Sequence, residues 1–159
     1  MILAETPRRK VVTQLVNWSH WFALLNIIIA VTIAAIYILN SPAPGSVIGT
    51  FYLFTNWLSH IGFLTFFGFI MLILPLCYLV PNVKVVKTLS SVLAALGLAL
   101  LAFDALLYNK YGVHLSLNSA ELIRAETQTA IAQFGWQQWG FLLLLFVVWL
   151  SFQLIVANA

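Results

Sequence analysis

The sequence predicts an all-α fold, a polytopic membrane helical bundle with four transmembrane helices. Of the 159 residues, 63% are hydrophobic and only 7% are charged, whereas soluble domains carry about 25% charged residues. Four apolar windows also reach the length of about 20 residues that a helix needs to cross a bilayer. Because backbone groups in lipid must be hydrogen-bonded internally, we expect these windows to be helices.

The expected spans follow one another within a single transmembrane domain, residues 1–159. They cover about residues 18–39, 56–80, 89–108 and 136–157. The apolar character of the second span already begins near Val47, and Pro75 is expected to kink this span or end its regular part. Turn-rich segments at 40–46 and 80–84 join the first three spans.

The connection of residues 109–135 is the longest, and it permits two interpretations. The segment 118–121 resembles an N-cap followed by a capping-box acid. Four apolar residues would then line one side of a short periplasmic helix lying on the membrane surface. These residues are Leu122, Ile123, Ile131 and Phe134. An ordinary polar loop fits the sequence equally well.

The positions of lysine and arginine predict the orientation, because these residues concentrate in cytoplasmic segments. Cations occur in the N-terminal tail and in the second connection, the first loop is uncharged, and the third loop is balanced by acids. The N terminus is therefore expected in the cytoplasm. The cytoplasmic cations are candidates to attract anionic lipid headgroups, at about 1 kcal/mol each, or they only set the orientation. They are Arg8, Arg9, Lys10, Lys84 and Lys87.

Five residues are candidates for polar contacts with a partner or between helices. They are His20, Trp21, Asn26, His60 and Asp104. Asn26 is expected to hydrogen-bond across to another helix. Asp104 is the only acid inside a span, and such acids are functional candidates by default. Because Asp104 lies near the outer end of its helix, a structural role at the start of the periplasmic loop is favoured over a proton relay.

The sequence offers no catalytic site, metal site or cofactor site. Paired membrane histidines can bind haem, but the predicted topology places His20 and His60 roughly 20 Å apart in depth, so they are not expected to share an iron. There is no nucleophile with a base and no phosphate-binding loop. The single cysteine, Cys77, excludes an intrachain disulfide. The cations form no basic stripe, so no nucleic-acid partner is expected.

Several motifs resemble one known family. The segment Trp18–Asn26, WSHWFALLN, resembles the opening helix of the YejM/PbgA (LapC) family of inner-membrane sulfatase-like proteins from Gram-negative bacteria. Supporting similarities are Ser59-His60, Leu72–Leu76, Leu89–Ala94, Asp104 and His114–Asn118. The resemblance covers about residues 11–120 well, and it covers the fourth span only in hydropathy.

This resemblance implies a five-helix anchor followed by a periplasmic domain of the alkaline phosphatase and sulfatase superfamily. The family is linked to lipopolysaccharide and outer-membrane lipid balance. The partners that it implies are lipopolysaccharide, anionic phospholipid such as cardiolipin, and a membrane-anchored protease adaptor. The fifth helix and the sulfatase-like domain are absent from this sequence. We therefore expect the four spans to be the front of a longer protein.

Three functions are compatible with these features. The leading hypothesis is a non-catalytic inner-membrane domain that regulates lipopolysaccharide and outer-membrane lipid homeostasis through contacts with a partner protein and with lipids. The second is the membrane anchor of a periplasmic sulfatase-like lipid-headgroup transferase or hydrolase. The third is a module that binds or transports cardiolipin.

Overall fold

The computed structural model describes residues 7–158 and confirms the all-α fold class. Four helical stretches of the described chain are long and apolar enough to cross a membrane: Pro7–Leu39, Val47–Leu79, Val83–Tyr111 and Trp136–Asn158. The first three begin well before the windows expected from hydropathy. The additional residues at the start of the first and third spans include the basic ones, and those of the second span follow the first loop. A helix can extend beyond the lipid core, where its residues need not be apolar.

Two of the four stretches are interrupted. The first consists of α1 (Pro7–Ile33) and α2 (Ala35–Leu39), and the second of α3 (Val47–Gly68), the π-helical turn η1 (Phe69–Ile73) and α4 (Leu74–Leu79). The π-helical turn lies directly before Pro75, which has no backbone N–H and cannot continue the regular ladder. The irregularity expected from Pro75 is therefore present, as a π-helix within a continuous span.

The third and fourth spans are α5 (Val83–Tyr111) and α7 (Trp136–Asn158). The Asn82 side chain caps α5 by accepting from the backbone N–H groups of Lys84 and Val85 at 3.1 and 3.2 Å. At the other end of α5, Gly112 adopts a left-handed conformation with φ of 67°, which suits a residue without a Cβ atom. These two caps set where the tight second connection ends and where the long third connection begins.

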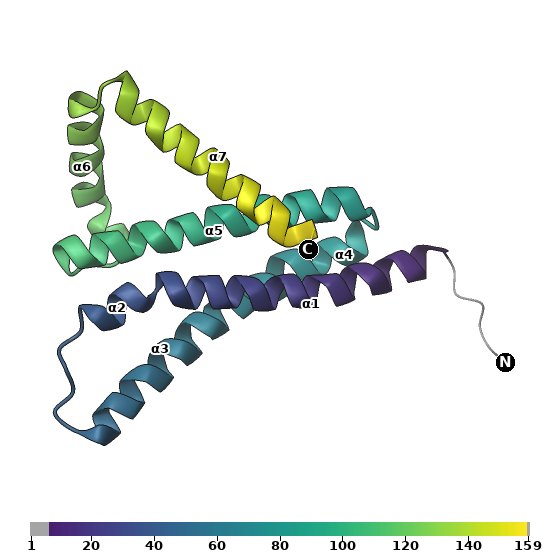
Figure 1. The fold of residues 1–159 in the computed structure, drawn as a ribbon, viewed down its shortest axis with the longest axis horizontal. Helices are drawn as coiled ribbons and strands as arrows, with labels where there is room; N and C mark the ends of the chain where they lie inside the picture. The colour runs from purple at the N-terminus through teal and green to yellow at the C-terminus, as the bar shows by residue number, and fades with distance from the viewer. Residues whose placement is uncertain (1–6, 159) are drawn as a thin grey trace.

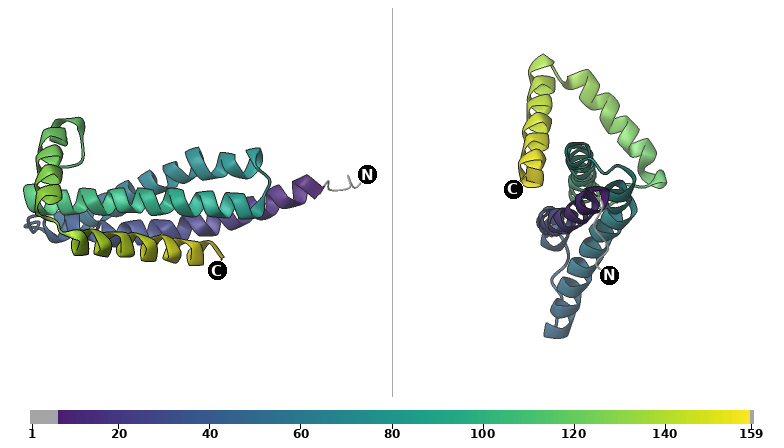
Figure 2. Two further views of the ribbon diagram at one scale, coloured as in Figure 1. Left: turned by 90° about the horizontal axis from the view of Figure 1, so that it is seen from above. Right: turned by 90° about the vertical axis from the view of Figure 1, so that its right-hand side faces the viewer.

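The helices α1 and α5 run side by side through the centre of the bundle (Figure 1). α3 contacts α1 and diverges from the bundle toward its own N terminus, and α7 packs on α5 near its C terminus. Figure 2 shows that the first half of α7 stands away from the other spans. In agreement with this arrangement, every residue from 134 to 148 is exposed.

The long third connection contains a short 3-10 turn, η2 (Leu117–Ser119), and the helix α6 (Ala120–Gln133). The helical interpretation is therefore correct, and the polar loop is wrong. The expected cap is also wrong, because Ser116 and Ser119 form the capping box and the side chain of Ser119 does not cap α6. α6 lies across the direction of α1 and α5 (Figure 2). This direction suits a helix on a membrane surface, which remains a prediction.

Three tryptophans tie the spans together through the same type of hydrogen bond. The indole N–H groups of Trp18, Trp57 and Trp149 donate to the backbone carbonyls of Ala157, Ala34 and Ala95 at 2.8, 3.0 and 3.1 Å. All three alanines are completely buried. Because alanine carries only a methyl group, the indole ring can reach the backbone of the neighbouring helix.

The bond between Trp149 and Ala95 provides a test of this packing. The substitution Trp149→Phe keeps an aromatic ring but removes the donor, so we expect α7 to dock less stably by about 0.6–1.7 kcal/mol, the range for interhelical hydrogen bonds in membranes. Denaturation of the purified protein in detergent micelles measures the change. The matched control is Trp136→Phe, at a residue that is 82% exposed. Equal stability of the two variants would contradict the proposed role of the bond.

Candidate functional site

The expected lipid-contact residues gather at one end of the bundle, which we call the basic end: Arg8, Arg9, Lys10, Lys84 and Lys87. They lie in the first turns of α1 and α5. The Arg8 guanidinium donates to the carbonyl of Tyr78 at 3.4 Å, and the Lys87 ammonium lies 5.4 Å from the centre of the Trp18 ring. Such cation–π geometry is worth about 0.5–1 kcal/mol at exposed sites.

The surface at the basic end is hollowed. A shallow pocket of about 440 Å³ lies between the start of α1 and the end of α4, and it is bordered by Arg8, Arg9, Asn17 and Tyr78. Polar and apolar groups meet there, as in the headgroup region of a bilayer. The arrangement offers positive charge beside aromatic rings, which is the chemistry that an anionic headgroup and its glycerol backbone can contact.

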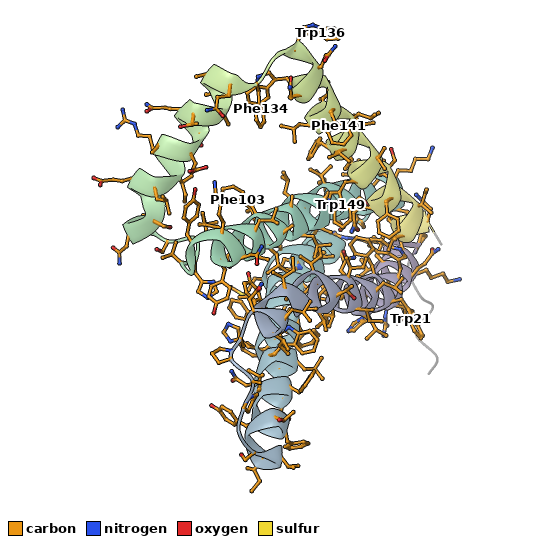
Figure 3. All side chains as sticks on the ribbon, turned by 60° about the vertical axis from the view of Figure 1, so that its left-hand side comes forward. Trp21, Phe103, Phe134, Trp136, Phe141 and Trp149 are labelled. Carbon is orange, nitrogen blue, oxygen red and sulfur yellow. The ribbon has the colours of Figure 1, made fainter. Side chains whose placement is uncertain are left out.

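The candidates on α1 do not share one surface. Trp21 is 69% exposed and points away from the bundle (Figure 3). His20 is exposed, donates through Nδ1 to the Val16 carbonyl at 2.6 Å and meets the Phe69 ring edge-on, with the ring centres 5.4 Å apart. Asn26, by contrast, is buried. Of these three α1 residues, only His20 and Trp21 are therefore accessible to another molecule.

The expected hydrogen bond from Asn26 to another helix is not formed. Its amide nitrogen donates instead to the Phe22 carbonyl one turn earlier in α1, at 2.8 Å. Its Oδ1 atom is buried and has no partner among the described residues. His60 lies exposed on α3. The structure gives it no polar contact within the described chain, so it joins no inter-helix network.

Asp104 accepts hydrogen bonds from three directions at the opposite end of the bundle. Its Oδ2 atom accepts from the Tyr37 hydroxyl of α2 at 2.5 Å and from Nδ1 of His114 at 2.9 Å. Its Oδ1 atom accepts from the backbone N–H of Leu115. The Tyr108 ring stacks on His114, with the ring centres 4.7 Å apart, and meets Tyr37 edge-on. We call Asp104, Tyr37, Tyr108, His114 and Leu115 the Asp104 latch.

The Asp104 latch joins α2, α5 and the loop after α5, a geometry in keeping with the structural role favoured for this acid. The side chain of Asp104 is 19% exposed. The three hydrogen bonds occupy both oxygens of the Asp104 carboxylate. Tyr37 and His114 were not identified from the sequence as partners. An interfacial tyrosine and a loop histidine are common in membrane proteins, so neither points to Asp104 in the sequence. The turn at Gly112 is what brings His114 back to Asp104.

A second polar contact fixes α6 to the end of α5. The Lys110 ammonium forms an ion pair with Oε2 of Glu126 at 3.0 Å, and the Tyr111 hydroxyl donates to Oε1 of the same carboxylate. The hydrogen bonds from Tyr111 and from Lys110 hold the pKa of Glu126 below its ordinary value. These groups are exposed, so this contact orients α6 more than it stabilises it.

The Asp104 latch predicts a local effect of Asp104→Ala. Removing the carboxylate leaves the Tyr37 hydroxyl and the Leu115 N–H without their acceptor, so we expect a loss of about 1–3 kcal/mol in the stability of this region. Hydrogen–deuterium exchange in micelles should rise over residues 112–119. The control Lys110→Gln breaks an exposed ion pair and should cost at most about 1 kcal/mol. Unchanged exchange at 112–119 in Asp104→Ala would show that the latch does not hold the loop.

The described residues contain no group of three or more histidine, cysteine, aspartate or glutamate side chains that could hold a metal ion. The histidines that raised the question of haem, His20 and His60, lie on different helices, α1 and α3.

Comparison with known proteins identifies relatives that include inner membrane proteins. The chain is 30% identical over 137 residues to the inner membrane protein YejM of Salmonella typhimurium and to that of Salmonella typhi, covering 86% of this chain and 23% of each relative. It is 32% identical over 105 residues to an uncharacterized protein of Haemophilus influenzae, covering 66% of this chain and 18% of that protein. The chain thus spans about a quarter or less of the length of these relatives.

A family model described as a domain of unknown function, DUF3413, matches residues 5–159. The match includes all four spans, the basic end and the Asp104 latch. It also includes α7, where the sequence resembled the family only in hydropathy. The chain therefore belongs to the DUF3413 family, the membrane domain that it shares with the N-terminal part of YejM.

Proposed function

We propose that this chain is the non-catalytic membrane domain of an inner-membrane protein that regulates lipopolysaccharide and outer-membrane lipid balance. It acts by contacts with a partner protein and with lipids, with its N terminus in the cytoplasm. The observation that carries the proposal is the amount of helix surface left without a partner in the bundle. The whole first half of α7 is exposed, and so are the α1 side chains His20 and Trp21.

Trp21 is the strongest candidate for partner contact on α1. It lies near the middle of α1, and its large ring is not used for internal packing, unlike that of Trp18. Tryptophan is enriched among the residues that dominate the binding energy of interfaces. By family resemblance, the partner is a membrane-anchored protease adaptor, whose engagement limits proteolysis of the first committed enzyme of lipid A synthesis.

The partner contact is tested by His20→Ala combined with Trp21→Ala in the full-length protein. We expect co-isolation of the adaptor from membranes to fall by about tenfold or more, because truncated hot-spot residues cost at least about 2 kcal/mol. Lipopolysaccharide content should fall with it, since the enzyme is then degraded faster. Phe51→Ala, at a ring of similar exposure on α3, is the control. If adaptor recovery and lipopolysaccharide both stay at the control level, partner contact through this surface is wrong.

Binding of anionic phospholipid is a second function, favoured by the basic end. Lys87 is held over Trp18, and Arg8 is held against Tyr78. The two contacts fix one positive charge in the first turn of α1 and another beside Trp18 of the same helix. Cardiolipin carries two phosphates on one headgroup, which makes it the anionic lipid best suited to several fixed cations.

The lipid contact is tested by Lys84→Gln combined with Lys87→Gln. At about 1 kcal/mol for each cation, the pair should weaken cardiolipin binding roughly thirtyfold. Native mass spectrometry of the protein from cardiolipin-containing nanodiscs measures the retained lipid. Lys110→Gln combined with Arg124→Gln removes the same charge outside the basic end and serves as the control. An equal loss in both double variants would mean that only net charge matters and that the basic end is not a site.

A further inference from the structure

His114 is the member of the Asp104 latch whose side-chain type changes charge near neutral pH. Its side chain is 60% exposed, whereas that of Asp104 is 19% exposed. Nδ1 of the imidazole lies 2.9 Å from Oδ2 of the carboxylate. Histidine gains or loses a proton between about pH 5 and 8, and carboxylates, lysine and tyrosine titrate outside this range. Solvent can therefore change the charge of His114 over a range in which a carboxylate stays ionised.

The charge of His114 decides how strongly the loop after α5 is bound to Asp104. A protonated imidazole forms a charge-assisted hydrogen bond to a carboxylate, which is about twice as strong as a neutral one. A neutral imidazole has a single N–H, which must lie on Nδ1 for the bond to persist. Loss of the proton therefore weakens the contact without abolishing it. The bonds to Asp104 from the Tyr37 hydroxyl and the Leu115 N–H do not involve this proton.

The surroundings of His114 make Asp104 its ionic partner. The rings of Tyr37 on α2 and Tyr108 on α5 face the imidazole, with ring centres 5.4 and 4.7 Å away. The other charged or titratable side chains on the neighbouring ends of α5 and α6 form no hydrogen bond or ion pair with His114 in the described chain. They are Lys110, Tyr111, Glu121, Arg124 and Glu126.

The backbone of His114 connects the latch to α6. The buried hydroxyl of Ser119 donates to the His114 carbonyl at 3.0 Å and lies 2.9 Å from the Ser116 carbonyl. Ser119 ends η2 and directly precedes α6, which packs mainly against η2. The other support of α6 is the exposed contact of Glu126 with the end of α5. A change that loosens His114 therefore loosens the support of α6.

We propose that the Asp104 latch is a proton-sensitive switch, which closes when His114 is protonated, loosens when it is neutral, and so sets how firmly α6 is held. The closed latch holds the proton in an ion pair and the open loop does not, so lowering the pH favours the closed state. This stabilisation is present in acid and is lost as the pH rises through the histidine range. In the proposed orientation, the protons that reach His114 are those of the periplasm.

Hydrogen–deuterium exchange of the full-length protein in nanodiscs tests the switch at about pH 5.5 and about pH 8, near the two ends of the histidine range. Each rate is compared with the intrinsic rate of the same sequence at that pH, because amide exchange itself depends on pH. We expect residues 112–119 to be about two- to fivefold more protected at the lower pH, the range for an ion pair with an exposed partner. Residues 86–98 of α5, away from the latch, are the internal reference and should not change.

Two variants separate the pair of His114 and Asp104 from any other titration. His114→Gln keeps an N–H that can donate to Asp104 but is uncharged at every pH, so residues 112–119 should be equally protected at both pH values. Asp104→Asn removes the opposite charge and should abolish the dependence as well. The matched control is His60→Gln, at an exposed histidine of α3, which should keep the full dependence.

Equal protection of residues 112–119 at both pH values in the unaltered protein would overturn the proposal, and so would greater protection at the higher pH. A dependence that persists in His114→Gln would assign it to another group, with the same consequence. Loss of the dependence in His60→Gln would also contradict it. None of these outcomes involves the adaptor or a bound lipid, so the switch and the proposed function can fail separately.

Discussion

The bundle depends on indole N–H groups that reach the backbone of a neighbouring helix where that helix carries an alanine. In lipid there is little hydrophobic driving force between helices, so contacts of this kind have to hold spans together. Trp57 joins the second span to the first, Trp149 joins the fourth to the third, and Trp18 joins the first to the fourth. The alanines are as necessary as the tryptophans, because a larger side chain would keep the ring from the carbonyl.

Polar groups are divided between the two ends of the bundle, with different consequences. At the basic end Arg8, Arg9, Lys10 and Lys84 are exposed, and Lys87 is half-buried over the Trp18 ring. At the other end Asp104 turns its oxygens inward and binds α2 and the loop together. The first arrangement suits recognition and the second suits rigidity.

The four spans could be predicted from apolar length alone, because lipid imposes one simple requirement on every residue of a span. The third connection was harder, since a helix and a loop have similar composition there and the capping serines precede the motif that suggested a cap. Asn26 shows the limit most clearly. A polar residue in a span is expected to find a partner on another helix, and the sequence cannot reveal that the Oδ1 atom of Asn26 is buried without one among the described residues. The partners of Asp104 depend on the turn at Gly112, which brings His114 back to the helix.

The π-helical turn before Pro75 sets the phase of the entire second span. Ile61 and Cys77 are 16 residues apart, and in a regular α-helix their side chains would diverge by about 160° around the axis. One extra residue accommodated in the π-turn reduces this angle to about 60°. Both residues are thereby buried in the bundle, Ile61 in a cluster with Ala30 and Cys77 in one with Leu15. The π-helical turn beside Pro75 thus acts as a register correction that lets both the later part of α3 and α4 pack against α1.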